Sequence, residues 1–239
     1  MNAPLAGCRV LHTRADHHWP QARAHLQALG AIASHLPLLD TRALPFALPE
    51  ALDAAVFTSA NAVTHFFAQS ALPCAAIAIG EKTREALVRH DHPPAMTAPP
   101  PYDSEALLAV WQAQGLNIAI IAAPGGRSHL HDTLSQMNRV HMVYAYERFC
   151  PSASANLAEA PDAILIGSCR TLDFLGKIAE PNTLKLLQCR TCVVAMSPRI
   201  ADYATQHGFR HVISANRADE DAQFHALCHW WALQQGVMR

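Results

Sequence analysis

Short apolar runs alternate along this chain with segments whose apolar residues recur every three or four positions. Runs at 8–13, 53–58, 75–79, 117–123 and 192–196 have the length and composition of buried strands. A helical pattern follows each of them and ends near a Gly, Pro or polar cluster. Alternating strands and helices predict an α/β protein with parallel sheets flanked by helices.

The pattern occurs twice. Asp53 lies six residues before Ser59, which opens a helical segment, and Asp162 lies six residues before Ser168, which opens another. The strand and turn that follow each helix also correspond. This self-similarity predicts two copies of one α/β unit.

The two copies differ at their ends. The middle copy finishes with a strand, a turn and a helix at 117–138, whereas the last copy has no such partner after residue 214. The N-terminal segment 8–30 has this arrangement and can complete the last copy. We therefore expect a discontinuous first lobe, a second lobe between its parts, and a two-stranded linker. The expected bounds are 1–33 with 151–239 for the first lobe, 43–140 for the second, and 34–42 with 141–150 for the linker.

The second linker segment alternates as a strand does. Met142, Tyr144 and Tyr146 fall on one face, and Val143 and Ala145 fall on the other. Ligands of parallel sheets bind at the carboxyl ends of the strands. We expect the two lobes to face each other across a cleft, with Tyr146 facing the reaction.

Composition restricts the function. The chain has 239 residues, of which 51% are hydrophobic and 15% charged, so it can bury substantial cores. Its formal net charge of −1 disfavours a nucleic-acid binder. Neither a bilayer-spanning stretch nor the apolar core of a signal peptide is found. The seven cysteines follow no disulfide framework, and we expect reduced thiols in a cytoplasmic protein.

One spacing matches a metal site. Cys189, Cys192, His207 and His211 have the spacing of a two-Cys, two-His zinc site. Cys192, however, opens an apolar strand, and Gly208 separates the two histidines. Packing is the preferred interpretation, and no metal is predicted.

Basic residues follow the predicted strands. A group of five at the ends of strands would suit a polyanion; its members are Arg14, Lys82, Arg127, Arg170 and Arg199. Gly125-Gly126 before Arg127 fits an anion cradle or a tight turn equally well. Ser59, Thr83 and Ser168 fit helix caps or ligand contacts.

Five motifs in this order resemble uroporphyrinogen-III synthases over nearly the whole chain. They are Thr13-Arg14, Val56-Phe57-Thr58-Ser59-Ala60-Asn61-Ala62-Val63, Ile79-Gly80-Glu81-Lys82-Thr83, Tyr102-Asp103-Ser104-Glu105-Ala106-Leu107-Leu108 and Tyr146-Glu147-Arg148.

The resemblance implies two flavodoxin-like lobes joined by a two-stranded crossover. It also implies the cyclisation of hydroxymethylbilane, a linear tetrapyrrole polycarboxylate, to uroporphyrinogen III, with inversion of ring D and loss of water. This is a hydro-lyase reaction of haem biosynthesis without metal or organic cofactor, and we expect a monomer. Tyr146 falls on the tyrosine that assists loss of the hydroxyl. The expected substrate-binding residues are Arg14, Ser59, Lys82, Thr83, Arg127, Ser168, Arg170, Ser197 and Arg199.

The sequence departs from the family in the first lobe. Ser197-Pro198-Arg199-Ile200-Ala201 stands where the family often has Gly-Pro-Thr-Thr-Ala, and Ile166-Gly167-Ser168-Cys169 stands in place of Phe-Thr-Ser-Pro. Two alternatives therefore stay open. One is a relative that binds a tetrapyrrole or a protein partner without turnover, and the other is a two-lobed ligand-binding or sensor module.

Overall fold

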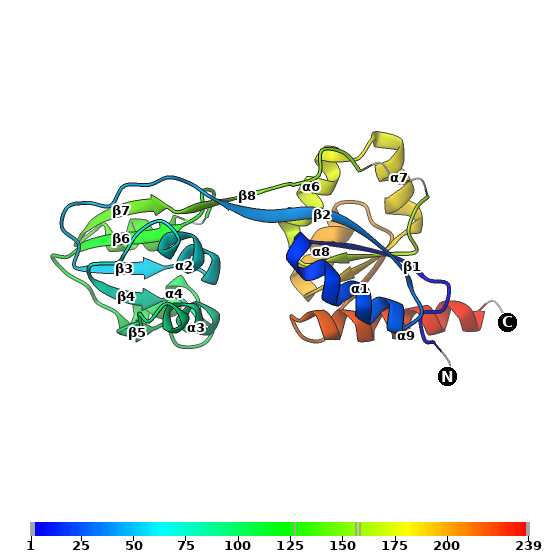
Figure 1. The fold of residues 1–239 in the computed structure, drawn as a ribbon, viewed down its shortest axis with the longest axis horizontal. Helices are drawn as coiled ribbons and strands as arrows, with labels where there is room; N and C mark the ends of the chain where they lie inside the picture. The colour runs from blue at the N-terminus through cyan, green and yellow to red at the C-terminus, as the bar shows by residue number, and fades with distance from the viewer. Residues whose placement is uncertain (1–2, 127, 156, 158, 238–239) are drawn as a thin grey trace. The chain divides into compact units, whose positions relative to one another are not determined.

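The computed structural model describes residues 3–126, 128–155, 157 and 159–237. The chain divides into two compact units (Figure 1). Unit 1 combines Met1–Asp40 with Phe149–Arg239, and unit 2 is Thr41–Arg148. The N-terminal segment therefore folds with the C-terminal part of the chain.

A six-stranded sheet, formed mainly by unit 1, has the order β11-β10-β9-β1-β2-β8, and the boundary between the units falls within β2 and β8. β1 pairs in parallel with β2 on one side and with β9 on the other, and β10 pairs in parallel with β9 and β11. The strands are β1 (Arg9–Arg14), β2 (Ile32–Ala43), β8 (Tyr146–Phe149), β9 (Ala163–Ile166), β10 (Cys192–Ala195) and β11 (His211–Ser214).

The central strands carry apolar side chains on both faces, and helices cover both faces of this sheet. Val10 packs with α1 (Trp19–Ala28) and α9 (Glu220–Val237). Leu11, the next residue of β1, packs in a separate core with α6 (Cys169–Ile178), α7 (Pro181–Arg190) and α8 (Pro198–Gln206). A short 3-10 helix, η1 (Asp16–His18), precedes α1.

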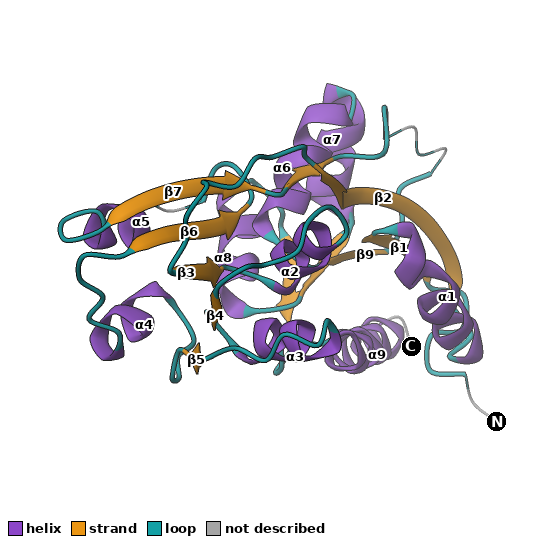
Figure 2. Ribbon diagram, turned by 60° about the vertical axis from the view of Figure 1, so that its left-hand side comes forward, coloured by secondary structure: helices purple, strands orange, loops and turns teal. Residues whose placement is uncertain are grey.

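The sheet of unit 2 has five parallel strands in the order β5-β4-β3-β6-β7, which lie side by side in Figure 1. They are β3 (Ala54–Phe57), β4 (Ala75–Ala78), β5 (Met96–Thr97), β6 (Asn117–Ala122) and β7 (Arg139–Tyr144). Helices again alternate with strands along the chain (Figure 2).

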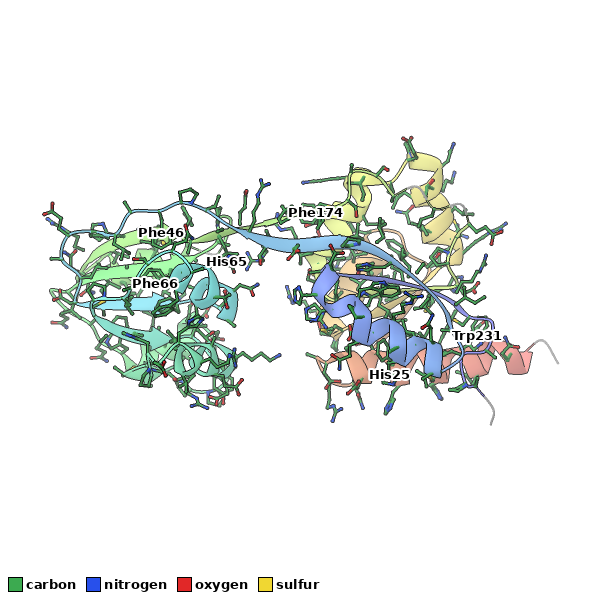
Figure 3. All side chains as sticks on the ribbon, in the orientation of Figure 1. His25, Phe46, His65, Phe66, Phe174 and Trp231 are labelled. Atoms are coloured by element: carbon green, nitrogen blue, oxygen red, sulfur yellow. The ribbon has the colours of Figure 1, made fainter. Side chains whose placement is uncertain are left out.

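Neighbouring residues of β3 enter different cores of unit 2. Phe57 packs with α2 (Ala60–Phe67) and α3 (Glu81–Arg89), where Phe46 stacks on Phe66 at 5.3 Å between ring centroids (Figure 3). Val56 packs with α4 (Ser104–Val110) and α5 (His129–Leu134). The period of two in the strands thus produces the three layers of the unit.

The structure confirms the predicted α/β class with two parallel sheets. One helix, α7, has no counterpart among the predicted elements. Of its described residues only Leu187 is buried. The helix therefore packs without a wide apolar stripe, which is the pattern by which a helix is predicted from the sequence. In the described part of the chain, none of the helices combines the length and apolar character that crossing a membrane requires.

The segment 141–150 differs from the predicted single strand. It contains the end of β7, in the five-stranded sheet, and then β8, in the six-stranded sheet. Ala145 separates them. Its amide donates to the Ala122 carbonyl at 3.1 Å, and its carbonyl accepts from the Leu44 amide at 3.0 Å.

The break at Ala145 changes the face of Tyr146. Met142 and Tyr144 are 36% and 41% exposed, as outward residues of β7, whereas Tyr146 is 1% exposed and packs with Val143. The prediction that Tyr146 shares a face with Met142 and Tyr144 is therefore wrong. Strict alternation holds only within one continuous strand.

Candidate functional site

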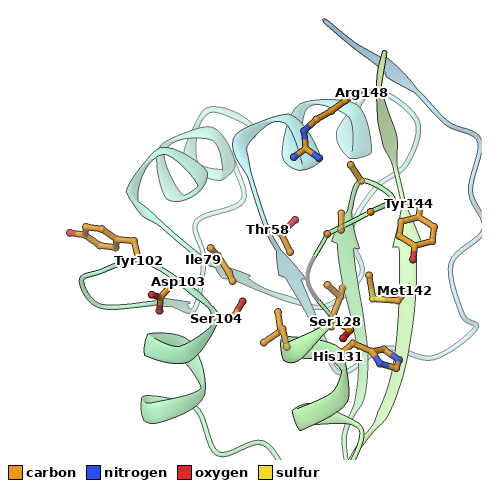
Figure 4. A pocket seen from close by; sticks show the side chains of 16 residues that line it. Thr58, Ile79, Tyr102, Asp103, Ser104, Ser128, His131, Met142, Tyr144 and Arg148 are labelled. Carbon is orange, nitrogen blue, oxygen red and sulfur yellow. The ribbon is translucent and has the colours of Figure 1, made fainter. Parts of the chain in front are cut away.

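A cavity of about 500 Å³ lies within unit 2 (Figure 4). It is situated where β3, β4 and β6 end, the edge at which parallel sheets usually bind ligands. Its size is in the range of small-molecule sites. The polar side chains that line it belong to Thr58, Tyr102, Asp103, Ser104, Ser128, His131, Tyr144 and Arg148.

Two polar side chains of the cavity lining form hydrogen bonds with backbone groups. Thr58 follows β3 and donates its hydroxyl hydrogen to the Ile121 carbonyl at 3.1 Å. Asp103 caps α4 by accepting the Ala106 amide at 2.8 Å. Arg148 is exposed and reaches the cavity from β8, so it brings a permanent positive charge to the lining.

Tyr146 lies in the core beside this cavity. Its phenolic oxygen is 2.9 Å from Ser59 Oγ and 3.1 Å from Arg148 Nη2. The His65 ring stacks on the phenol at 5.4 Å between centroids, and the Arg148 guanidinium carbon lies 5.5 Å from the centroid of the phenol ring. These contacts hold the ring in one orientation.

Ser59 has two contacts at once. It is the residue before α2, and its Oγ accepts the Ala62 amide at 3.1 Å as a helix cap. The same Oγ meets the phenol of Tyr146. The cap and the contact with the proposed catalytic residue are therefore compatible.

Three of the binding residues expected in unit 2, Ser59, Lys82 and Thr83, lie outside the cavity lining. Lys82 is exposed in the first turn of α3. Thr83 is buried in the same turn, and its amide donates to the Gly80 carbonyl at 3.0 Å. Arg127 lies outside the described residues, although Gly125 and Gly126 before it do line the cavity.

In unit 1, Arg14 ends β1 within a network of polar groups. Its guanidinium lies 3.3 Å from the carboxylate of Glu220, the first residue of α9, and 3.0 Å from His18 Nε2. The buried His12 ring donates from Nε2 to Glu220 at 3.0 Å. The other ring nitrogen of His12, Nδ1, is buried without a partner among the described residues.

These contacts change two pKa values. Burial, the charge of Arg14 and the neighbouring His17 lower the pKa of His18 to about 4. Burial raises the pKa of Glu220, but the hydrogen bond from His12 and the charge of Arg14 outweigh it and leave this pKa below its ordinary value. Both groups therefore favour the forms present at neutral pH, a neutral His18 and a charged Glu220.

The remaining expected residues follow β9 and β10 of unit 1. Ser168 caps α6 by accepting the Thr171 amide at 3.2 Å, and Arg170 in the first turn is exposed. Ser197 precedes α8 but makes no side-chain hydrogen bond to the described backbone of that helix. Arg199 is exposed, and Ile200 is buried in the core.

Two of the four residues with zinc-like spacing have described surroundings within the fold of unit 1. Cys192 is buried in β10, and burial raises the pKa of its thiol to about 12. His207 ends α8 with its Nδ1 2.8 Å from the Tyr203 carbonyl. Over the described ranges, no three His, Cys, Asp or Glu side chains form a metal-binding group.

Sequence reasoning did not single out several side chains of the cavity, including Tyr102, Ser128, His131 and Tyr144. Ser128 and His131 share Asp132 as a partner, since both lower the pKa of this carboxylate by hydrogen bonding. The sequence did indicate the kind of position, because most of these residues lie just before or within the first turn of a helix that follows a strand. Only the fold shows which of these turns share one cavity.

Comparison with known proteins identifies the family and proteins of similar fold. The family model "Uroporphyrinogen-III synthase HemD" matches residues 20–224. A mutant uroporphyrinogen III synthase from the extremely thermophilic bacterium Thermus thermophilus is similar in structure, with a TM-score of 0.63 and 20% identity over 96% of this chain and 100% of that one.

Uroporphyrinogen-III synthetase from Helicobacter pylori also has a TM-score of 0.63, with 15% identity over 93% of this chain and 99% of that one. A comparison with curated protein sequences finds no significant match. Because the family model covers most of its length, this chain belongs to the uroporphyrinogen-III synthase family.

Proposed function

We propose that this chain cyclises hydroxymethylbilane to uroporphyrinogen III as a hydro-lyase, with Tyr146 as the source of the proton that releases the hydroxyl. In this reaction the terminal hydroxyl of the linear tetrapyrrole leaves, ring D is inverted through a spiro intermediate, and the macrocycle closes. The product belongs to haem biosynthesis.

The chemistry requires an acid and an ordered substrate. Expelling hydroxide is unfavourable unless a proton reaches the leaving oxygen, and a phenol with a pKa of about 10 retains its proton at neutral pH. The pyrrole nitrogens stabilise the azafulvenium cation that forms. The remaining task is to hold ring D so that the substituted carbon attacks, which is catalysis by orientation.

The observation that carries the proposal is the position of Tyr146. Its oxygen is bonded to Ser59 and Arg148, and Arg148 lines the cavity at the edge of the sheet of unit 2. The phenol is thereby connected to a space of suitable size through polar groups. A buried phenol without such contacts would serve packing alone.

The substrate carries acetate and propionate arms, which need hydrogen-bond donors and positive charge. We propose that Arg14, Arg127, Arg170, Arg199 and Lys82 supply charge, and that Ser59, Thr83, Ser168 and Ser197 supply hydroxyls or nearby amides. We also propose that the protein is a monomer. A location in the cytoplasm, where thiols stay reduced, suits its free cysteines.

The test is incubation with hydroxymethylbilane, followed by separation of the isomers. We expect the wild-type protein to form the type III isomer, and Tyr146→Phe to lower kcat by roughly 100-fold or more, the usual contribution of a general acid. Tyr203→Phe is the matched control, since Tyr203 donates to Asp173 within unit 1 and should leave kcat unchanged.

Three results would contradict the proposal or its assignment of Tyr146. Formation of only the type I isomer, which arises without an enzyme, would exclude synthase activity. Affinity for the product without any turnover would indicate a member of the family that only binds a tetrapyrrole. Full activity of Tyr146→Phe would assign the proton to water or to a substrate carboxylate.

A further inference from the structure

The buried position of Tyr146 raises the question of how its proton leaves the core. The side chain is 1% exposed, whereas both of its bonding partners are more accessible: Ser59 is half-buried, and Arg148 is exposed and lines the cavity. The substrate therefore cannot contact the phenolic oxygen directly in this arrangement. A second group has to transfer the proton.

The chemistry of the partners sets the direction of the hydrogen bonds around Tyr146. A guanidinium only donates, so Arg148 Nη2 gives a hydrogen to the phenolic oxygen. The phenol has one hydrogen of its own, and a buried hydroxyl needs an acceptor. Among the contacts of the described residues, Ser59 Oγ at 2.9 Å is the acceptor available to it.

Ser59 then has one hydrogen left to donate. Its Oγ accepts the phenolic hydrogen on one side and the Ala62 amide at 3.1 Å on the other. A hydroxyl has two acceptor positions and one donor. With both acceptor positions occupied, the hydrogen of Ser59 is directed away from Tyr146 and from the helix backbone.

The neighbouring hydroxyl is less suited to this role. Thr58 lines the cavity, but its hydrogen is donated to the Ile121 carbonyl at 3.1 Å. Ser59, the next residue, lies outside the lining but is half-buried, and it ends the chain of hydroxyls that starts at Tyr146. Of the two groups bonded to the phenol, Ser59 is the one that can pass on a proton, because the guanidinium of Arg148 stays protonated.

We propose that Ser59 is the terminal proton donor of a two-hydroxyl relay, in which Tyr146 supplies the proton and Arg148 stabilises the phenolate that remains. This rests on the proposed cyclisation of hydroxymethylbilane. Ser59 is thus a catalytic residue in addition to a helix cap. Arg148 is a positioning residue that also balances charge.

The step balances without a further reactant. The bond between carbon and the hydroxyl oxygen breaks, and the oxygen takes the Ser59 proton and leaves as water. Ser59 Oγ takes the proton of Tyr146, whose phenolate is held by Arg148. When the macrocycle closes, the attacking ring carbon loses a proton, which returns through Ser59 to the phenolate.

The test separates the cap from the relay by substitutions at one position. Ser59→Thr keeps both the cap and the hydroxyl, whereas Ser59→Asn keeps a cap acceptor but carries an amide that does not release a proton. We expect Ser59→Thr to retain kcat within about threefold and Ser59→Asn to lose roughly 100-fold or more. The free energy of unfolding, measured in parallel, should stay close to wild type in both variants, because both keep an acceptor for the helix cap.

Equal activity of Ser59→Asn and wild type would overturn the relay, and so would equal losses in the Asn and Thr variants. Tyr146→Phe distinguishes this failure from failure of the proposed function. If Tyr146→Phe is slow and Ser59→Asn is not, the phenol acts without Ser59 and the proposed function stands. If the wild type forms only the type I isomer, both proposals fail.

Discussion

At the scale of single residues, the tyrosine singled out by its motif occupies a different environment from the one predicted. Tyr146 is buried, and its polar contacts with Ser59 and Arg148 connect it with the cavity. Tyr146 could be selected from the sequence because its motif consists of adjacent residues. Its partner Ser59 lies 87 positions away, so the pair exists only after folding.

The dependence of stability on pH tests the polar network around Arg14. The pKa of His18 is lowered to about 4, mainly by burial and the charge of Arg14, against about 6.5 in the unfolded chain. Between these values the unfolded state binds the proton first, so stability falls as the pH drops from 6.5 to 4 and changes no further below 4. The pKa of Glu220 is also lowered, which adds a loss of stability below about 4.5.

We expect His18→Gln, which keeps an acceptor for Arg14, to flatten the loss between pH 6.5 and 4 by about 1 kcal/mol, since solvent screens the partly exposed ring. Urea unfolding at several pH values measures this. His229→Gln, at an exposed position of α9, is the control. Parallel pH profiles for the wild type and His18→Gln would contradict the assignment.

At the scale of elements, the ends of helices were the most informative local signals. Ser59 and Ser168 cap α2 and α6 as their sequence context indicates, because a cap depends on a few adjacent residues. The segment 141–150 was harder to interpret, because its alternation crosses from one sheet to another at Ala145. Pairing partners decide where a strand ends, and they are distant in sequence.

The cap of α9 provides a prediction at this scale. Asp219 accepts the Ala222 amide at 2.8 Å, and α9 carries Phe224 into the core beside β1. Asp219→Ala should lower the free energy of unfolding by about 1 kcal/mol, and Asp219→Asn should restore most of it. Denaturant titration is the measurement, with the exposed Asp202→Ala of α8 expected within about 0.5 kcal/mol of wild type. Similar losses in the Ala and Asn variants would show that the cap is not the cause.

At the scale of the whole molecule, each of the four cores is made of residues from one unit. We propose that the units are also separate units of stability. Phe66 is buried among Phe46, Phe57 and Phe67 in unit 2, and Phe224 is buried in unit 1. Removing either ring should cost about 3–5 kcal/mol within its own unit.

Hydrogen exchange measures where this loss appears. Phe66→Ala should accelerate amide exchange in β3, β4 and β6 and leave β9 and β10 protected. Phe224→Ala should do the reverse and accelerate β1 together with β9 and β10, although residues 9–14 are far from them in sequence. Equal acceleration in both units by either variant would show a single cooperative body.

The sequence by itself determined the α/β class, the repeat and the hydroxyls that begin helices, because hydrophobic periodicity and capping act over a few neighbouring residues. The tertiary structure decided which of these residues meet. It buried Tyr146 against Ser59, joined Arg14 to Glu220 and enclosed the cavity of unit 2. Each of these contacts joins segments that are far apart in the sequence, and strand pairing and core packing bring them together.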